Sequence, residues 1–258
     1  MFTFIKCFLL LLAFSFLSAG RVPRPEERII GGNAIAIEEA PWQVSLQLHG
    51  HHYCGGSIYS KDIIITAAHC RFTTAGLRLE AEDFLIRVGS SLKDSEGTLV
   101  KVAAICSHED YSFFKKNDIA VMRLSEPLKF TNKVQSIPLA KKNPAPGTIA
   151  MVSGWGATLI YPSYDGSYQF LYPINLQGVY NYVQSWNTCI RSHSMTENTF
   201  CAGHFGQSAC NGDSGGPLVV NQTLVGVVSE GTIYCIDSTV YVSVSDLRAW
   251  ILNAIESI

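Results

Sequence analysis

The sequence predicts an all-β fold, built as β-barrels or as a β-sandwich, and three observations support this prediction. Short strand-like segments recur along most of the chain, which has 258 residues. Turn residues, mainly Gly, Ser, Asp and Asn, separate these segments. A helical pattern is clear only at residues 245–255. Many short strands with little helix are typical of barrels and sandwiches.

The first strand is expected at residues 42–48, where Trp-Gln-Val-Ser-Leu-Gln-Leu alternates apolar and polar side chains as a half-buried strand does. Further strand-like segments lie at 56–59, 63–67, 84–88, 99–105 and 119–124. After a loop at 144–147 they resume at 149–155, 176–183, 217–220, 224–229 and 239–244. In the final helix Ser245 is expected to be the N-cap, and one face carries Leu247, Trp250, Ile251, Ala254 and Ile255.

Size and charge limit the class of function. A chain of 258 residues can form one large all-β unit or two halves of about a hundred residues each. The formal net charge is −2 and charged residues make up 16% of the chain. No basic surface for nucleic acid and no acidic tail is therefore expected, and ordinary protein partners fit this composition.

Residues 1–20 are typical of a signal peptide. Lys6 supplies an early positive charge, residues 8–17 form an apolar run, and Ser18-Ala19-Gly20 offers small residues for cleavage. The run is short for a membrane span and no other segment could cross a bilayer, so we expect a secreted protein without a membrane anchor after cleavage. Secretion places the cysteines in an oxidising compartment. Of the eight, Cys7 lies in the leader, so an odd number, seven, remains and at least one has no partner within the chain.

Residues 21–28 (Arg-Val-Pro-Arg-Pro-Glu-Glu-Arg) are charged and proline-rich, and an apolar segment, Ile29-Ile30-Gly31-Gly32, follows directly. A cut after Arg28 would release a new ammonium group at Ile29. A proline-rich linker that is never processed is the alternative from composition alone.

Three distant segments together indicate a nucleophilic site. Gly212-Asp213-Ser214-Gly215-Gly216 can hold one serine hydroxyl clear of its backbone, although ordinary turns use the same residue types. His69 follows an apolar run and Asp118 precedes another, where each alone could be structural or solvated. A zinc site at His69-Cys70 lacks the partner spacing that such sites use. The chain order His, Asp, Ser matches one known order of a catalytic triad.

With these residues the sequence resembles the trypsin/chymotrypsin family of serine endopeptidases from Ile29 to the end. The matching motifs are Ile-Ile-Gly-Gly at 29–32, Thr-Ala-Ala-His-Cys at 66–70, Asn-Asp-Ile-Ala at 117–120, Ser-Gly-Trp-Gly at 153–156 and Gly-Asp-Ser-Gly-Gly-Pro at 212–217. The resemblance implies two six-stranded antiparallel β-barrels with the active site between them. It divides the protease domain, 29–258, into barrels at about 29–137 and 138–244 and a helix at about 245–256.

The resemblance also implies roles for single residues. Ser214 would be the nucleophile, His69 the general base and Asp118 the residue that orients the imidazole. The N–H groups of Gly212 and Ser214 would form the oxyanion hole, and Ser229 would donate a hydrogen bond to Asp118.

Activation is implied as well. A trypsin-like protease would cleave after Arg28, and the new terminus at Ile29 would pair with Asp213. Three disulfides carry over by matching positions, namely Cys54–Cys70, Cys189–Cys201 and Cys210–Cys235. Cys106 is left over, and a buried free thiol is expected there.

Primary specificity rests on the residues that match the family's pocket. Ser208, six residues before the nucleophile, would form a neutral floor, Gly231 would leave the walls open, and Thr239 would narrow the base beside Ser229. We therefore expect a chymotrypsin-like or elastase-like preference, with a trypsin-like preference as the alternative. Glu230 replaces a tryptophan common in the family, which favours a catalytically silent relative acting as a binding or regulatory module as a second alternative.

Other expectations concern partners and modification. Protein or peptide substrates, an activating protease and protein inhibitors are the expected partners of a monomer, with no cofactor, no metal and no nucleic acid. Asn221-Gln222-Thr223 matches the glycosylation sequon, which makes Asn221 a candidate site. His49, His51 and His52 are interpreted as polar surface residues near a hairpin tip.

Overall fold

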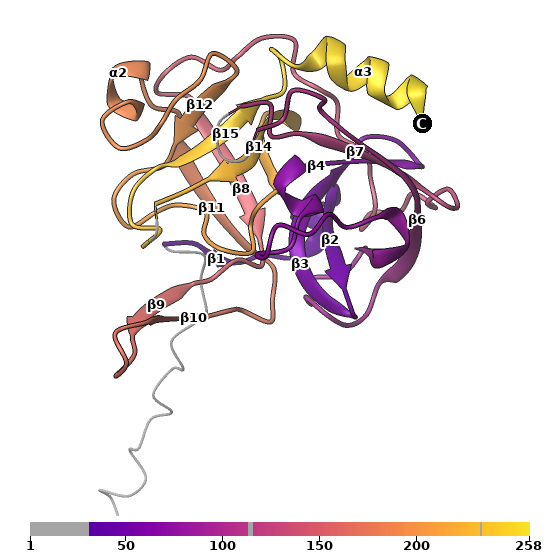
Figure 1. Cartoon of the computed structure of the whole chain (residues 1–258), viewed down its shortest axis with the longest axis horizontal. Coiled ribbons are helices and arrows are strands. Elements are labelled where there is room, and N and C mark those ends of the chain that lie inside the picture. Colours follow the sequence, from indigo (N-terminus) through magenta and orange to yellow (C-terminus); the bar gives the residue numbers. More distant parts are fainter. Residues whose placement is uncertain (1–30, 113–115, 233) are drawn as a thin grey trace, which may run out of the picture.

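The structure is a computed structural model and describes residues 31–112, 116–232 and 234–258 (Figure 1). The predicted signal peptide, the activation segment and both residues of the predicted cleavage site, Arg28 and Ile29, lie outside the described residues. Within the part of the chain that is described, no helix is both long and apolar enough to cross a membrane.

The first half of the chain forms a closed barrel of antiparallel strands in the order β2-β3-β4-β7-β6-β5. Alternating burial along β5 (Phe84–Val88) shows how the pattern of the sequence produces the barrel, because one face of each strand fills its interior. The other strands of this barrel are β2 (Gln43–Leu48), β3 (His51–Ile58), β4 (Ile63–Thr66), β6 (Thr98–Ser107) and β7 (Ala120–Leu124).

The second half of the chain, together with β1 from its beginning, forms a seven-stranded sheet in the order β1-β11-β8-β13-β14-β15-β12. Its strands are β1 (Asn33–Ala34), β8 (Ile149–Gly154), β11 (Gln177–Tyr182), β12 (Thr199–Ala202), β13 (Pro217–Val220), β14 (Thr223–Glu230) and β15 (Thr239–Ser243). This sheet curves into a half-barrel, and an isolated bridge between Val183 and Ala202 joins the end of β11 to β12. The predicted fold class is confirmed, with β1 as an additional short strand paired with β11.

A two-stranded hairpin that the sequence analysis did not predict projects from the second half (Figure 1). It consists of β9 (Leu159–Pro162) and β10 (Tyr168–Leu171), most of whose residues are at least partly exposed. Without a buried face the hairpin has no alternating pattern to reveal it. The short helices are α2 (Trp186–Cys189), η1 (Ile37–Glu39), η2 (Ala68–Arg71) and η3 (Ala81–Asp83).

The C-terminal helix α3 (Arg248–Ser257) begins three residues later than the sequence predicts. Leu247 occupies the N-cap position, so the predicted cap at Ser245 is wrong; the Ser245 hydroxyl donates a hydrogen bond to Asn143 Oδ1 at 3.0 Å instead. The helix packs against β7 of the first barrel, where Arg123 donates to the carbonyl groups of Ile255 and Ile258.

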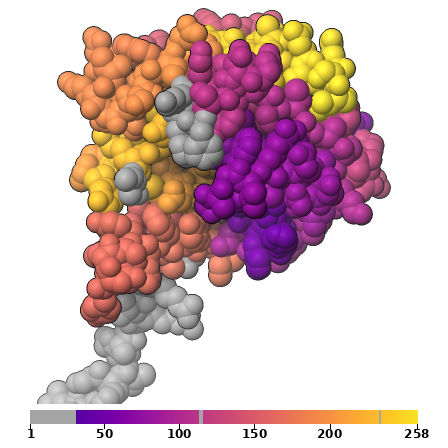
Figure 2. Space-filling view, viewed as in Figure 1, coloured from indigo at the N-terminus to yellow at the C-terminus, as the bar shows by residue number. Residues whose placement is uncertain are grey.

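One continuous buried cluster joins the two halves. It runs from the interior of the first barrel to α3 and includes Trp155, Val219 and Val227 of the second half. Shared burial of this kind fixes the halves relative to one another. Figure 2 shows the two halves in contact across one face of the molecule, with the hairpin at the lower edge.

Candidate active site

His69 lies where β4 of the first barrel gives way to the single turn η2 (Ala68–Arg71). Its backbone N–H donates to Asp118 Oδ1 at 2.8 Å, and its ring atom Nδ1 lies 2.7 Å from Asp118 Oδ2. Asp118 is an acceptor when ionised, so Nδ1 carries the proton and Nε2 is the basic nitrogen. Residues that are 49 positions apart in sequence therefore form one hydrogen-bonded unit.

Asp118 is held ionised in a buried position. It precedes β7, is 3% exposed and also accepts a hydrogen bond from the Ser229 hydroxyl at 2.6 Å. Burial alone would raise the pKa of Asp118, but the charge of His69 and the hydrogen bonds from His69 and Ser229 outweigh it and lower that pKa. A fixed negative charge therefore lies against the imidazole.

The negative charge of Asp118 changes the pKa of His69. Burial lowers the pKa of His69, but the charge of Asp118 and its hydrogen bond have a larger combined effect, so the net shift is upward. The imidazolium form is thus stabilised relative to solution, which suits a group that accepts a proton during a reaction.

Ser214 lies on a tight turn anchored to both halves of the molecule. Its carbonyl accepts from Gly55 N of β3 at 2.7 Å, and Gly215 N donates to Val228 O of β14 at 2.8 Å. Gly215 has φ +76, and a Cβ atom there would lie 2.2 Å from Thr66 Oγ1. Only glycine is compatible with this turn, because a side chain would be both strained and overlapping.

The turn exposes two backbone donors. Within the described residues, neither Gly212 N nor Ser214 N donates a hydrogen bond to another protein group. Unpaired N–H groups are rare in folded proteins, and here both belong to the turn that carries the candidate nucleophile. They could bind the oxygen of a tetrahedral intermediate.

His52 fixes this turn from the first barrel, which contradicts its interpretation as a polar surface residue. Its Nδ1 accepts from the Ser45 hydroxyl at 2.8 Å, and its Nε2 donates to the Gly212 carbonyl at 2.9 Å. The ring packs edge-on against Trp155 at 5.5 Å. Burial outweighs the opposing effect of the Gly212 hydrogen bond and lowers the pKa of His52 to about 4, so the ring is neutral. No local sequence signal identifies this contact.

Asp213 is completely buried beside the turn. It accepts hydrogen bonds from Cys210 N at 2.9 Å and Gly156 N at 2.8 Å. A Cβ atom on Gly156 would lie 2.2 Å from Asp213 Oδ2, which explains the glycine that ends the Ser-Gly-Trp-Gly motif. Burial raises the pKa of Asp213 to about 6, and no described cation forms an ion pair with it. Its charge is therefore poorly compensated by the described residues.

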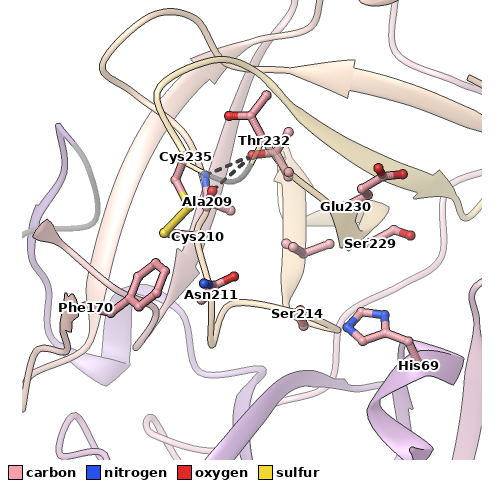
Figure 3. A pocket seen from close by; sticks show the side chains of 13 residues that line it. His69, Phe170, Ala209, Cys210, Asn211, Ser214, Ser229, Glu230, Thr232 and Cys235 are labelled. Atoms are coloured by element: carbon pink, nitrogen blue, oxygen red, sulfur yellow. Dashed lines mark hydrogen bonds between the residues drawn. A yellow bond between two sulfur atoms is a disulfide. The ribbon is translucent and has the colours of Figure 1, made fainter. Parts of the chain in front are cut away.

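A cavity of about 410 Å³ opens beside Ser214. Figure 3 shows His69 and Ser214 at one end of it and the Cys210–Cys235 disulfide with Phe170 at the other. The lining comprises His69, Phe170, Ala209, Cys210, Asn211, Ser214, Val228, Ser229, Glu230, Gly231, Thr232, Cys235 and Thr239. A side chain of a bound peptide could enter this cavity while its backbone lies beside Ser214.

The predicted pocket residues divide into two groups. Ser229, Gly231 and Thr239 line the cavity, whereas Ser208 does not. Ser208 is fully buried, and its hydroxyl donates to the carbonyl of Cys235, which does line the cavity, so its role as the floor stays a prediction. Thr239 is one of the polar residues that line the cavity, and its hydroxyl oxygen accepts a hydrogen bond from Ala209 N at 3.1 Å.

The three predicted disulfides, Cys54–Cys70, Cys189–Cys201 and Cys210–Cys235, are all present. The first links β3 to the turn that carries His69, and the third borders the cavity. Cys106 is unpaired and half-buried. The sulfurs of Cys54 and Cys70 lie near His69, but as a disulfide they offer no thiolate to a metal.

Asn221 does not line this cavity and lies at the exposed turn between β13 and β14. It has φ 48, and the following Gln222 has φ 56, which are the values of a tight hairpin turn. The sequon is therefore presented at the surface.

The chain is similar to known proteins over most of its length. A family model described as trypsin matches residues 29–251. Trypsin delta of Drosophila erecta is 44% identical over 242 residues, which cover 91% of this chain and 91% of that relative. Hypodermin-B of Hypoderma lineatum is 38% identical over 264 residues, which cover 99% of this chain and 98% of that relative.

Two solved structures have the same arrangement. Neuropsin, a serine protease expressed in the limbic system of mouse brain, superposes with a TM-score of 0.77 at 28% identity, covering 87% of this chain and 98% of its own. A scabies mite inactivated protease paralogue superposes with a TM-score of 0.78 at 28% identity, covering 89% of this chain and 98% of its own.

Proposed function

The chain belongs to the trypsin family and is a serine-type endopeptidase, and from this premise we propose that it is a secreted zymogen that cleaves protein substrates through Ser214, His69 and Asp118. The observation that carries the proposal is the contact of 2.7 Å between His69 Nδ1 and Asp118 Oδ2 at the same cavity that Ser214 lines. The proposed protein acts as a monomer, and protein inhibitors would bind the same cavity.

In the proposed mechanism Ser214 Oγ attacks the carbonyl carbon of the scissile peptide bond while its proton passes to His69 Nε2. The C–N bond then breaks, His69 returns the proton to the departing amine, and an acyl-enzyme remains. Water hydrolyses the ester with His69 again as base, which regenerates Ser214. The charge of Asp118 stabilises the imidazolium in both halves of the reaction.

The N–H groups of Gly212 and Ser214 would bind the oxyanion in each tetrahedral intermediate. A donor in this position typically contributes about 3 kcal/mol to the transition state. His52 supports this role, because its hydrogen bond to the Gly212 carbonyl holds the peptide unit that lies between the two donors. A histidine with a pKa of about 4 keeps this hydrogen bond throughout the neutral range.

Activity should depend on pH through His69. The imidazole must be neutral to accept the Ser214 proton, and its pKa is raised above the ordinary value of 6.5. We expect kcat/KM to fall as the pH drops through the raised pKa, with a midpoint above pH 6.5. In Asp118→Asn the raising charge is lost, so the midpoint of the residual activity should move to lower pH. If the midpoint of kcat/KM is the same in Asp118→Asn as in the wild type, His69 and Asp118 do not have the roles proposed for them.

Primary specificity is proposed to be chymotrypsin-like or elastase-like. Among the described residues that line the cavity, none at the Cys210–Cys235 end is a carboxylate, and Asp237 is engaged with the Ser192 hydroxyl and Ser238 N. Thr239 narrows the cavity without offering a charge. These features favour medium apolar side chains and give an arginine no partner deep in the cavity.

A panel of reporter peptides that differ only before the scissile bond tests this proposal. Peptides with Leu, Met or Phe should be cleaved at least about tenfold faster than the peptide with Arg. Thr239→Gly removes the side chain that narrows the base of the cavity, so the preference should shift toward Phe. A wild-type preference for Arg would support the trypsin-like alternative and refute this pocket assignment.

The rival proposal is a catalytically silent homologue that acts as a binding or regulatory module. The similarity to an inactivated protease paralogue favours it. The presence of His69 and Ser214 at one cavity, with Asp118 hydrogen-bonded to His69, favours the enzyme. Turnover of any reporter peptide by the processed protein decides between the two.

A further inference from the structure

Glu230 lies between two cavities at the end of β14. Its side chain lines the main cavity at the end where His69, Ser214 and Ser229 lie (Figure 3). It also lines a small cavity of about 10 Å³ together with Lys116, Asn117 and Asp118. The small cavity holds no more than about one water molecule, so a ligand side chain can approach Glu230 only from the main cavity.

The carboxylate of Glu230 has no partner among the residues that the structure describes. It is half-buried, but no described group donates a hydrogen bond to it or forms an ion pair with it, Lys116 included. Burial and the nearby charge of Asp118 both raise the pKa of Glu230. A half-buried carboxylate without a partner is unfavourable, and a cation beside it would remove that cost.

The charged groups facing Glu230 leave a place for such a cation. Asp118 adds a second negative charge, and its oxygens are already occupied by His69 and Ser229. His69 is directed to Asp118, and Lys116 lines only the small cavity on the other side. None of these described groups places a positive charge on the open side, so a substrate side chain could supply one.

We propose that Glu230 is a specificity-determining residue that forms an ion pair with a lysine or arginine side chain of the substrate, next to the residue that fills the cavity. The basic side chain would not be the one that enters the cavity, because a side chain directed to the Cys210–Cys235 end would point away from Glu230, which lies at the end with His69 and Ser214. The preferred substrate would combine an apolar residue before the scissile bond with a basic residue nearby. This inference rests on the proposed endopeptidase activity.

The test uses reporter peptides with one leucine before the scissile bond and a single lysine placed in turn at the second, third and fourth positions before that bond. Each lysine peptide is paired with the same peptide carrying glutamine. For wild-type protein we expect kcat/KM to be about tenfold higher for lysine than for glutamine at one position, with a smaller ratio in 1 M salt. The ratio should fall to about one in Glu230→Gln.

Two further variants separate a direct ion pair from an indirect effect. Glu230→Lys should prefer glutamate over glutamine at the same position, which a general disturbance of the site would not produce. Glu126→Gln, an exposed carboxylate that lines neither cavity, should leave the lysine preference unchanged. Because each ratio compares two peptides with one protein, it does not depend on the total activity of a variant.

The possible failures are distinguishable. If the processed wild-type protein cleaves none of the peptides, the proposed function is wrong. If it cleaves lysine and glutamine peptides at the same rate at all three positions, or if Glu230→Gln retains the preference, the assignment to Glu230 is wrong while the endopeptidase proposal stands.

Discussion

Replacing Ser214 with alanine should reduce kcat for peptide hydrolysis by about 10⁵ to 10⁶. Alanine removes the only atom that can form the acyl-enzyme, while the N–H groups of Gly212 and residue 214 and the cavity stay in place. Substrate binding should therefore change little, and the loss should appear in kcat. Initial rates with the best reporter peptide of the panel measure this.

The control for this substitution is Ser136→Ala, which removes an exposed hydroxyl outside the cavity. It should leave both kcat and KM unchanged. Near-ultraviolet circular dichroism should show that both variants retain the wild-type packing. Turnover by Ser214→Ala above about one hundredth of the wild-type rate would remove this serine from its proposed role.

Replacing Arg28 with glutamine should leave an inactive precursor after treatment with a trypsin-like protease. The physical reason is Asp213, whose buried carboxylate has a pKa raised to about 6 and no ion pair with any described residue. A new ammonium group at Ile29 would supply the positive charge that Asp213 lacks. It would thereby favour the conformation in which the turn presents the N–H groups of Gly212 and Ser214. We expect activity at least about a hundredfold below that of the treated wild type, because the active conformation becomes a minor population.

The matched control is Arg24→Gln, which removes a basic residue from the same segment but leaves the predicted cleavage site intact. This variant should be processed and active. Amino-terminal sequencing of the treated wild type should begin at Ile29. Full activity from uncleaved Arg28→Gln protein would refute activation by a new terminus.

The barrel strands were predictable because burial leaves a mark on the sequence. β5 alternates between the interior and the outside, and the apolar run of β4 is completely buried. β2 alternates apolar and polar residues in sequence, although all of it except Leu48 is buried. The β9–β10 hairpin has no buried face, and β12 is short, so neither produced a pattern. The cap of α3 was misplaced because Asn143, a hundred residues away, competes for the hydroxyl of Ser245.

The residues of the candidate site also fall into two groups: those that local motifs identify and those that depend on distant contacts. His69, Asp118 and Ser214 could be named from local motifs, and their chain order suggested a triad. His52 could not, because its role depends on a contact with Gly212, which is 160 residues away. The contact of Ser208 with the Cys235 carbonyl could not be predicted either, because it is set by the fold of the loop and not by the residue itself.

The most direct test of the central claim is labelling of the processed protein with a fluorophosphonate, which reacts with a serine only when a neighbouring base activates it. The account predicts one covalent adduct, located by peptide mass spectrometry on Ser214, that is absent after His69→Ala substitution. An unlabelled processed protein, or an adduct on another residue, would contradict the proposal that Ser214, His69 and Asp118 act as one catalytic unit.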